Sequence, residues 1–119
     1  MVFAHDTAVS LQAAVTLVNS GEDPDTLTSQ EELDAFYDRF DWHLHAVSPD
    51  APLDRRIAVE TAMAMIDVIR ADEMSRLGVC AQDDCEGIVL DLSRNRSKIF
   101  CGSSCSNRAA VAAYRARHR

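Results

Sequence analysis

The spacing of apolar positions predicts three helices in the first two thirds of the chain. The first helix is expected over residues 7–19, where apolar side chains recur at helical spacing and Asp6 or Thr7 can cap the start. A loop that contains Gly21 and Pro24 should follow it. The expected apolar stripe consists of Val9, Leu11, Ala14, Val15, Leu17 and Val18.

The second helix is expected to begin near Thr28. The overlapping segments TSQE and SQEE both place a Glu three residues after a Ser or Thr, a pattern that satisfies free backbone amides at a helix start. The residues expected on the buried face of this helix are Leu33, Phe36, Tyr37 and Phe40.

A third helix is expected after a linker. Pro49 and Pro52 end any preceding helix and favour an extended chain. The helix should begin with Asp54 as its cap, and Gly78 stands where a left-handed cap would end it. Its expected buried face consists of Ile57, Met63, Ile66, Ile69 and Met74.

The last forty residues have a different pattern. Apolar residues alternate over 87–92, which predicts a short strand. The turn residues of SRNRS then lead to a second expected strand at 98–100, so that a hairpin lies between two pairs of cysteines. A final helix is predicted over residues 104–117 because alanine and arginine both favour helices. Val111 and Tyr114 are expected to pack against the hairpin.

All four cysteines of the chain lie within 26 residues, as Cys80-x4-Cys85 and Cys101-x3-Cys105 separated by fifteen residues. Two close pairs of thiolates are what a tetrahedral zinc ion requires. A segment of about 40 residues buries too little apolar surface to fold alone, and a bound metal supplies the missing stability. We therefore expect one Zn²⁺ per chain, structural because sulfur occupies all four positions.

The alternatives to zinc are two disulfides, an iron–sulfur cluster or four unrelated thiols. Disulfides need an oxidising compartment, whereas the N-terminal sequence lacks the features of a signal peptide, so a cytoplasmic location is expected. A second possible metal site at His43 and His45, beside Trp42, has no cysteine nearby and is much less favoured.

Charge divides the chain into two parts. The 119 residues are 47% apolar and 26% charged, which is ordinary for a globular protein, and no segment predicts a membrane span. Of the formal net charge of −7, residues 1–79 contribute −10 and residues 80–119 contribute +3. An acidic protein is ordinarily a poor ligand for nucleic acid, but screening over about 8 Å lets a basic segment act locally.

Residues 77–117 resemble the CGNR zinc finger. The likeness rests on the cysteine spacing, on VLDLSRNRS at residues 89–97 and on Cys105-Ser106-Asn107-Arg108, where Ser106 stands in place of the glycine of the naming motif. The resemblance implies DNA binding in bacterial, stress-related transcription regulators. Residues 7–75 resemble a shortened ABATE domain, an alanine-rich helical domain thought to sense a ligand or to mediate assembly.

The expected fold class is mainly α with a small β-hairpin. Residues 1–76 should form an ABATE-like helical domain. Residues 77–119 should form a treble-clef-like zinc finger of the CGNR type, with four cysteine ligands.

Basic residues of the finger are the candidates for DNA contact. On an extended strand Arg94, Arg96 and Lys98 would share one face, and arginine forks match phosphate oxygens and guanine edges. In another interpretation Arg94 or Arg108 is structural and bonds Asp91 or loop carbonyls near the metal. The full set of expected DNA-binding residues is Arg94, Arg96, Lys98, Asn107, Arg108, Arg115 and Arg117.

These patterns together predict a zinc-dependent DNA-binding transcription regulator. An enzyme is not expected, because no nucleophile has a base near it in the sequence. A homo-oligomer through the helical domain is expected, since one small basic module makes few contacts with DNA. The alternatives are a protein–protein adaptor that uses the zinc module, or a ligand sensor built on the helical domain.

Overall fold

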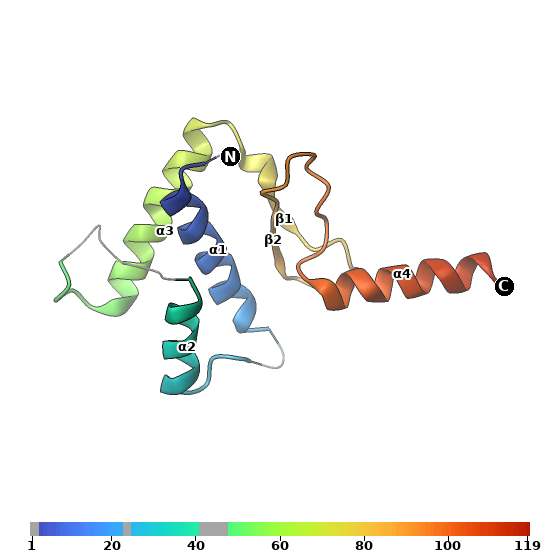
Figure 1. The fold of residues 1–119 in the computed structure, drawn as a ribbon, viewed down its shortest axis with the longest axis horizontal. Coiled ribbons are helices and arrows are strands. Elements are labelled where there is room, and N and C mark those ends of the chain that lie inside the picture. The colour runs from blue at the N-terminus through green and yellow to red at the C-terminus, as the bar shows by residue number, and fades with distance from the viewer. Residues whose placement is uncertain (1–2, 23–24, 41–47) are drawn as a thin grey trace. The chain divides into compact units, whose positions relative to one another are not determined.

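The computed structural model describes residues 3–22, 25–40 and 48–119, and it divides the chain into two compact units, Met1–Met74 and Ser75–Arg119. The prediction that residues 1–76 and 77–119 are separate domains stays a prediction. The predicted fold class, mainly helical with a small hairpin, is confirmed (Figure 1). The elements are α1 (His5–Ser20), α2 (Gln30–Phe40), α3 (Leu53–Arg70), a short 3₁₀ turn η1 (Met74–Arg76), β1 (Leu77–Val79), β2 (Ile88–Leu90) and α4 (Ser103–Arg117).

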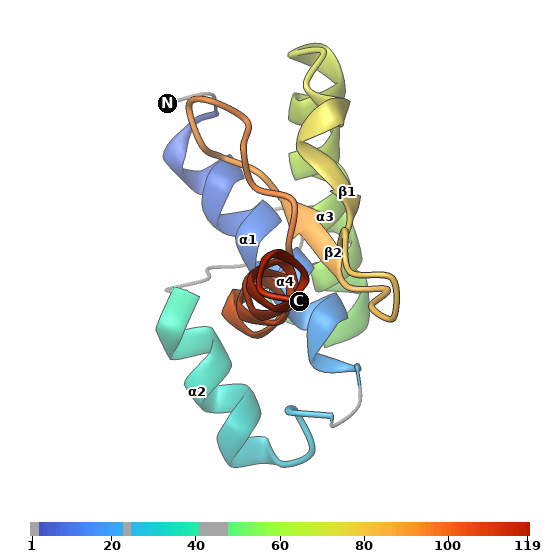
Figure 2. The same cartoon turned by 90° about the vertical axis from the view of Figure 1, so that its right-hand side faces the viewer.

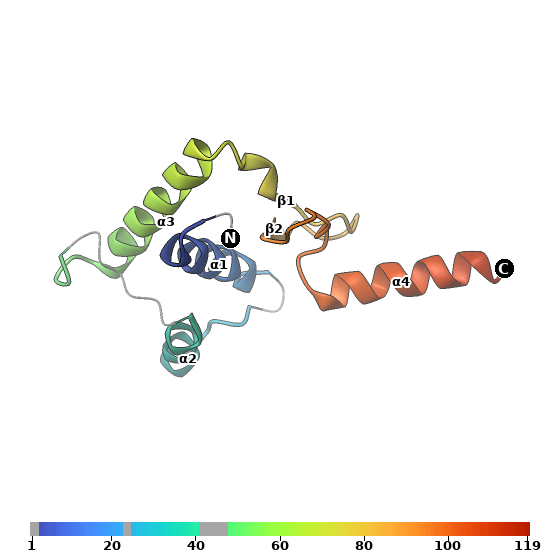
Figure 3. The same cartoon turned by 45° about the horizontal axis from the view of Figure 1, so that its top comes forward.

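In the first unit α1 lies between α2 and α3 (Figure 3). Ala13 of α1 and Phe36 of α2 are buried against each other, and Ile57 of α3 packs on the same cluster. The predicted buried face of α2 is confirmed, because Leu33, Tyr37 and Phe40 are half-buried around Phe36.

None of the helices in the described ranges is both long and apolar enough to cross a membrane.

The predicted start of α2 is also confirmed. Glu32 donates its backbone N–H to Ser29 Oγ at 3.2 Å, and Glu32 Oε2 accepts the backbone N–H groups of Ser29 at 3.0 Å and Thr28 at 2.8 Å. This reciprocal arrangement is a capping box built on SQEE. The hydrogen bond from the Thr28 backbone is the main cause of a lowered pKa at Glu32.

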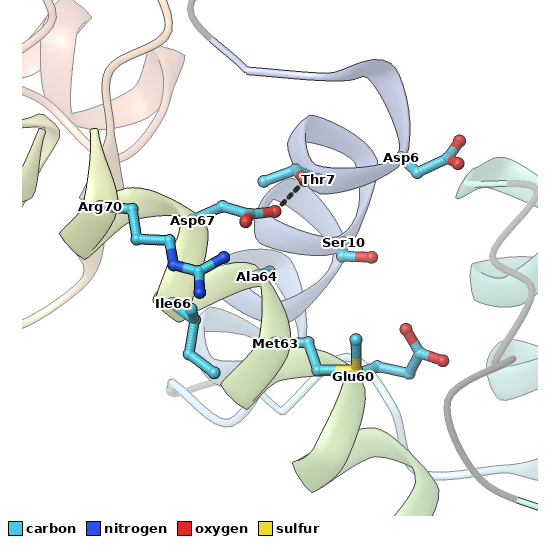
Figure 4. A pocket seen from close by; sticks show the side chains of 9 residues that line it. All are labelled: Asp6, Thr7, Ser10, Glu60, Met63, Ala64, Ile66, Asp67 and Arg70. Carbon is cyan, nitrogen blue, oxygen red and sulfur yellow. Dashed lines mark hydrogen bonds between the residues drawn. The ribbon is translucent and has the colours of Figure 1, made fainter.

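The predicted cap of α1 is wrong. The helix begins at His5, so Asp6 and Thr7 lie inside its first turn, and the N-cap residue is Ala4, without a side-chain hydrogen bond. Thr7 Oγ1 instead donates to Asp67 Oδ2 of α3 at 2.6 Å (Figure 4). The two side chains lie at a groove of about 480 Å³ between α1 and α3, which is lined by Asp6, Thr7, Ser10, Glu60, Met63, Ala64, Ile66, Asp67 and Arg70.

The predicted end of α3 is wrong, and of its predicted buried face only Ile57 packs into the core. The helix ends at Arg70, and Asp72, with φ of 54°, adopts the left-handed conformation expected of Gly78. Ala64 and Val68 are the buried residues of α3. These two lie four residues apart on one face, and small side chains there let α1 approach closely. The other residues of the predicted face are exposed, Met63, Ile66 and Ile69 on α3 and Met74 in the η1 turn after it.

In the second unit β1 and β2 form an antiparallel hairpin in which Leu77 pairs with Leu90 and Val79 with Ile88. The predicted strand over 87–92 is confirmed in its central part, but the predicted partner at 98–100 is wrong. That segment belongs to a long loop that leaves β2 and returns to α4 (Figure 2). The hairpin therefore encloses the first cysteine pair instead of lying between the two pairs.

The predicted helix at the carboxyl end is confirmed as α4, but its predicted packing is wrong. Val111 is 47% exposed and Tyr114 is 59% exposed, because only the first turns of α4 lie beside the hairpin and its loops (Figure 1). The ring of Tyr114 contacts that of His118, with centroids 4.3 Å apart. The rest of α4 is a helix without a packed face in this unit.

The capping box generates a stability prediction. Ser29→Ala removes the side-chain acceptor for the Glu32 amide, and loss of such a cap costs about 1 kcal/mol. We expect a lower unfolding temperature for the helical unit, measured by circular dichroism. Thr26→Ala, in the loop before the cap, is the control and should melt like the wild type. Equal melting of the two variants would contradict the assigned cap.

Candidate metal centre

The four cysteines converge from two segments of the finger. Cys80 directly follows β1 and Cys85 lies in the loop before β2, while Cys101 precedes α4 and Cys105 lies in its first turn. The four sulfurs all lie within 4.8 Å of one another. The Sγ–Sγ distance is 3.6 Å from Cys85 to Cys101 and 3.8 Å from Cys101 to Cys105.

These distances fit a zinc ion. Four sulfurs at about 2.3 Å from a tetrahedral zinc lie about 3.8 Å from one another. A disulfide would require about 2.05 Å, and all four cysteines are free thiols. The predicted site of one structural zinc is therefore confirmed, with sulfur at every position. The alternative pair His43 and His45 lies outside the described residues.

Backbone amides point at the sulfurs. Gly87 donates its N–H to Cys85 Sγ, and Cys101 donates its N–H to Cys80 Sγ, both at 3.4 Å. Burial disfavours the Cys80 thiolate, but hydrogen bonds, first among them the backbone bond from Gln82, lower its pKa to about 7. Burial and the neighbouring thiols raise the pKa of Cys101 to about 12. Zinc ligation requires thiolates, so metal binding must release the proton that burial and the neighbouring thiols retain on Cys101.

The ligands also form the core of the finger. Cys80 and Cys105 are buried around Val89, with Phe100 and the remaining two cysteines packed against them. Because few other side chains are buried in this cluster, the finger has little apolar core apart from its metal ligands. We therefore expect its fold to depend on the metal.

Gly87 is required by the close packing of the site. A Cβ at this position would lie 3.0 Å from both Cβ and Sγ of Cys101 and 3.3 Å from Cys85 Sγ. These separations are shorter than ordinary van der Waals contacts, so only glycine fits without displacing a ligand. Sequence reasoning missed this role, although an isolated glycine at a strand end signals a close approach of the backbone.

Arg108 connects the start of α4 to the first cysteine pair. Its NH1 donates to Asp84 Oδ2 at 2.7 Å, and its NH2 donates to Cys105 Sγ at 3.4 Å. The hydrogen bond from Arg108 lowers the pKa of Asp84. Both side chains are largely exposed, so the pair adds little stability by itself. Its geometry nevertheless matches the alternative interpretation in which Arg108 is structural.

The loop that follows β2 is closed around Asp91. One carboxylate oxygen accepts both the hydroxyl and the backbone N–H of Ser93, and the other accepts the backbone N–H of Lys98 at 2.9 Å. The bond from the Ser93 hydroxyl is the main cause of a lowered pKa at Asp91. Arg76 NH1 donates to the carbonyls of Asp91 and Ser93, both at 3.0 Å. Arg76 thus has the structural role considered for Arg94.

The predicted basic stripe on an extended strand is wrong. Residues 94–95 form a turn and Arg96 has a left-handed backbone with φ of 51°, because Asp91 draws both ends of the loop together. Arg96 NH1 donates to Ser75 Oγ at 3.0 Å. Arg96 and Lys98 line one cavity with Arg76, whereas Arg94 is exposed at the turn and does not line it.

The remaining candidates lie on α4. Asn107 is exposed in the second turn, and Arg115 and Arg117 are exposed in the last turn. Their contact with DNA stays a prediction.

The sequence did contain a signal for the Asp91–Ser93 contact, since Asp two residues before Ser is typical of side-chain-closed turns. It contained none for Arg76, whose role depends on the hairpin partner that was predicted wrongly.

A four-thiolate centre between a hairpin loop and a helix defines the second unit as a zinc finger. Residues 76–118 match the family model of the CGNR zinc finger, which confirms the resemblance for this part of the chain. Ser106 occupies an ordinary helical position in α4, so the glycine of the naming motif is not needed there. No curated protein matches the chain. The ABATE-like character of residues 7–75 stays a prediction.

The two glycines of the hairpin region provide a matched test of the site. Gly87→Ala should weaken zinc binding about 10-fold or more, because the added methyl overlaps two ligands and overpacking costs about 1–3 kcal/mol. Gly78→Ala is the control, since a Cβ there has no neighbour within 4 Å. Competition with a chelator of known zinc affinity measures the zinc affinity of both variants. Equal affinities would show that the packing at Gly87 is not tied to the metal.

Proposed function

We propose that this chain is a cytoplasmic, non-enzymatic transcription regulator that binds double-stranded DNA through its zinc finger. The observation that carries the proposal is the state of α4, which is fixed at the zinc site by its first turn and exposed at every residue over 110–119. Three arginines lie in that exposed part, Arg115 and Arg117 in the last turn of α4 and Arg119 just after it. The match of residues 76–118 to the CGNR zinc finger supports the same class of function.

A helix of this kind suits the major groove. The groove is about 12 Å wide and accepts an α-helix. Small side chains keep α4 narrow, because alanine is the commonest residue between Ser103 and Arg117. Arginine forks can then reach phosphate oxygens or guanine edges.

The structure changes the roles proposed for individual residues. Arg108 is best assigned to holding Asp84 and Cys105, so its contribution to DNA binding would be indirect. The direct contacts in the proposal come from two segments. They are Asn107, Arg115 and Arg117 on α4, and Arg94, Arg96 and Lys98 in the preceding loop.

A protein–protein adaptor is the second candidate function. The exposed Val111 and Tyr114 on α4 favour it, because apolar side chains on an otherwise polar helix often mark a partner surface. Salt distinguishes the two functions. Binding to phosphates weakens steeply as ionic strength rises, whereas an apolar interface hardly responds.

Self-association and ligand sensing by the helical unit both stay predictions. The exposed Met63, Ile66 and Ile69 of α3 support a contact with a second copy, which sedimentation velocity would detect as a doubled mass. The groove between α1 and α3 has the size of a ligand site, and its lining combines Met63, Ala64 and Ile66 with three carboxylates, Asp6, Glu60 and Asp67.

The proposed function is tested by titrating zinc-loaded protein with random-sequence duplex DNA and following fluorescence anisotropy at several salt concentrations. The wild type should bind, with affinity falling as salt rises. The variant Arg115→Ala/Arg117→Ala should bind more weakly and reduce the slope of log K against log salt by about 2, one for each lost phosphate contact.

The control variant Arg55→Ala/Arg70→Ala removes the same charge from α3 and should bind like the wild type. Absence of binding at low salt by protein with one zinc per chain would contradict the proposal. Binding that does not depend on salt would favour the adaptor.

A further inference from the structure

A cavity of about 290 Å³ lies beside the hairpin of the zinc finger. Three consecutive segments between Ser75 and Ile99 form it: the η1 turn, the hairpin with its connecting loop, and the loop closed by Asp91. Its charged lining residues are Arg76, Asp91, Arg96 and Lys98. None of these belongs to α4, so this cavity is separate from the exposed helix.

The cavity has an excess of positive charge. Asp91 is only 5% exposed, and both its oxygens already accept hydrogen bonds from Ser93 and from the Lys98 backbone. The carboxylate is thus directed into its own loop. Arg96 and the Lys98 side chain are exposed, and Arg76 adds a third cation in the wall. Three cations against one carboxylate leave a site that favours an anion.

The backbone of Arg96, whose conformation follows from closure of the loop by Asp91, is a second observation at this cavity. A φ of 51° is uncommon for any residue other than Gly, Asn or Asp, and such strained positions cluster at binding sites. Here the left-handed turn accompanies a hydrogen bond from the Arg96 guanidinium to Ser75 Oγ at the cavity wall. An arginine thus holds a position that asparagine or glycine would occupy at lower conformational cost.

We propose that this cavity binds a phosphate group, held by Arg96 and Lys98 and assisted by the Ser75 hydroxyl and the fixed charge of Arg76. Guanidinium and ammonium donors match phosphate oxygens, and charge-assisted hydrogen bonds are the strong ones. The exposed apolar side chains of Val79 and Ile99 also line the cavity and can contact an attached sugar. Phosphate binding by this cavity does not depend on the proposed DNA-binding function. Only the assignment of the bound phosphate to a DNA backbone rests on that function.

The first experiment uses inorganic phosphate as the probe. The ¹⁵N-labelled, zinc-loaded full chain is titrated with phosphate at constant ionic strength, and amide shifts are followed. We expect saturable shifts in residues 75–81 and 91–99. Arg96→Asn should weaken phosphate binding about 10-fold, because asparagine tolerates the left-handed backbone but lacks the cation. Lys98→Gln should weaken it as well, whereas Arg55→Gln on α3 should not.

Each variant must first show one zinc per chain and a wild-type pattern of amide shifts outside the cavity. Lack of saturable shifts in these two segments, or equal phosphate affinity in Arg96→Asn and the wild type, would overturn the proposal. Arg96→Lys provides a further check, since it keeps the charge and should bind phosphate better than Arg96→Asn.

The second experiment identifies the source of the phosphate. If the DNA backbone supplies it, Arg96→Asn should reduce the salt slope of duplex binding by about 1. If Arg96→Asn no longer binds inorganic phosphate but binds duplex DNA like the wild type, the ligand is a free phosphate or a phosphorylated small molecule. The proposed phosphate site is then supported. Phosphate binding without any DNA binding would reject the proposed function and leave this inference intact.

Discussion

Ligation of one metal ion by four thiolates is the constraint on which the zinc finger depends. The hairpin has only three residues in each strand, and the buried cluster beside it consists mainly of the cysteines themselves. Such a segment does not bury enough apolar surface to offset its conformational entropy. The metal both supplies that free energy and joins the loop of the hairpin to the first turn of α4. Gly87 and Arg108 act on the same centre, one by allowing close packing and the other by connecting Asp84 to Cys105.

Once the metal fixes its first turn, the rest of α4 is available for binding. The exposed arginines of α4 and the cavity proposed to bind phosphate are different surfaces, yet both are positioned by the same small scaffold. Arg76 and Asp91 hold the loop that carries Arg96 and Lys98, while Cys105 and Arg108 hold the helix. The acidic helical unit cannot substitute for either surface, because its formal charge has the opposite sign.

Local signals in the sequence predicted local structure well. The cysteine spacing predicted the metal centre, SQEE predicted the cap of α2, and the alanine–arginine run predicted α4. Two local signals failed, since Ala4 caps α1 and Asp72 takes the left-handed position expected of Gly78. The other errors concern contacts between distant segments. Residues 98–100 have strand-like composition, but the register of β1 with β2 is fixed by a turn around two metal ligands, which periodicity does not encode. The buried face of α3 follows Ala64 and Val68, because close helix packing selects small residues over large ones. The conformation of Arg96 follows from hydrogen bonds to Asp91, which appear only when the loop is closed.

The most direct test of this account is a pair of ¹⁵N–¹H spectra of the full chain, one with zinc and one after removal of zinc by a chelator. If zinc organises the finger, amide signals of residues 77–117 should lose their dispersion in the metal-free protein and regain it when zinc is restored. Signals of residues 5–20 and 53–70 should stay in place. A metal-free protein in which the hairpin and α4 keep their dispersed signals would contradict the central claim.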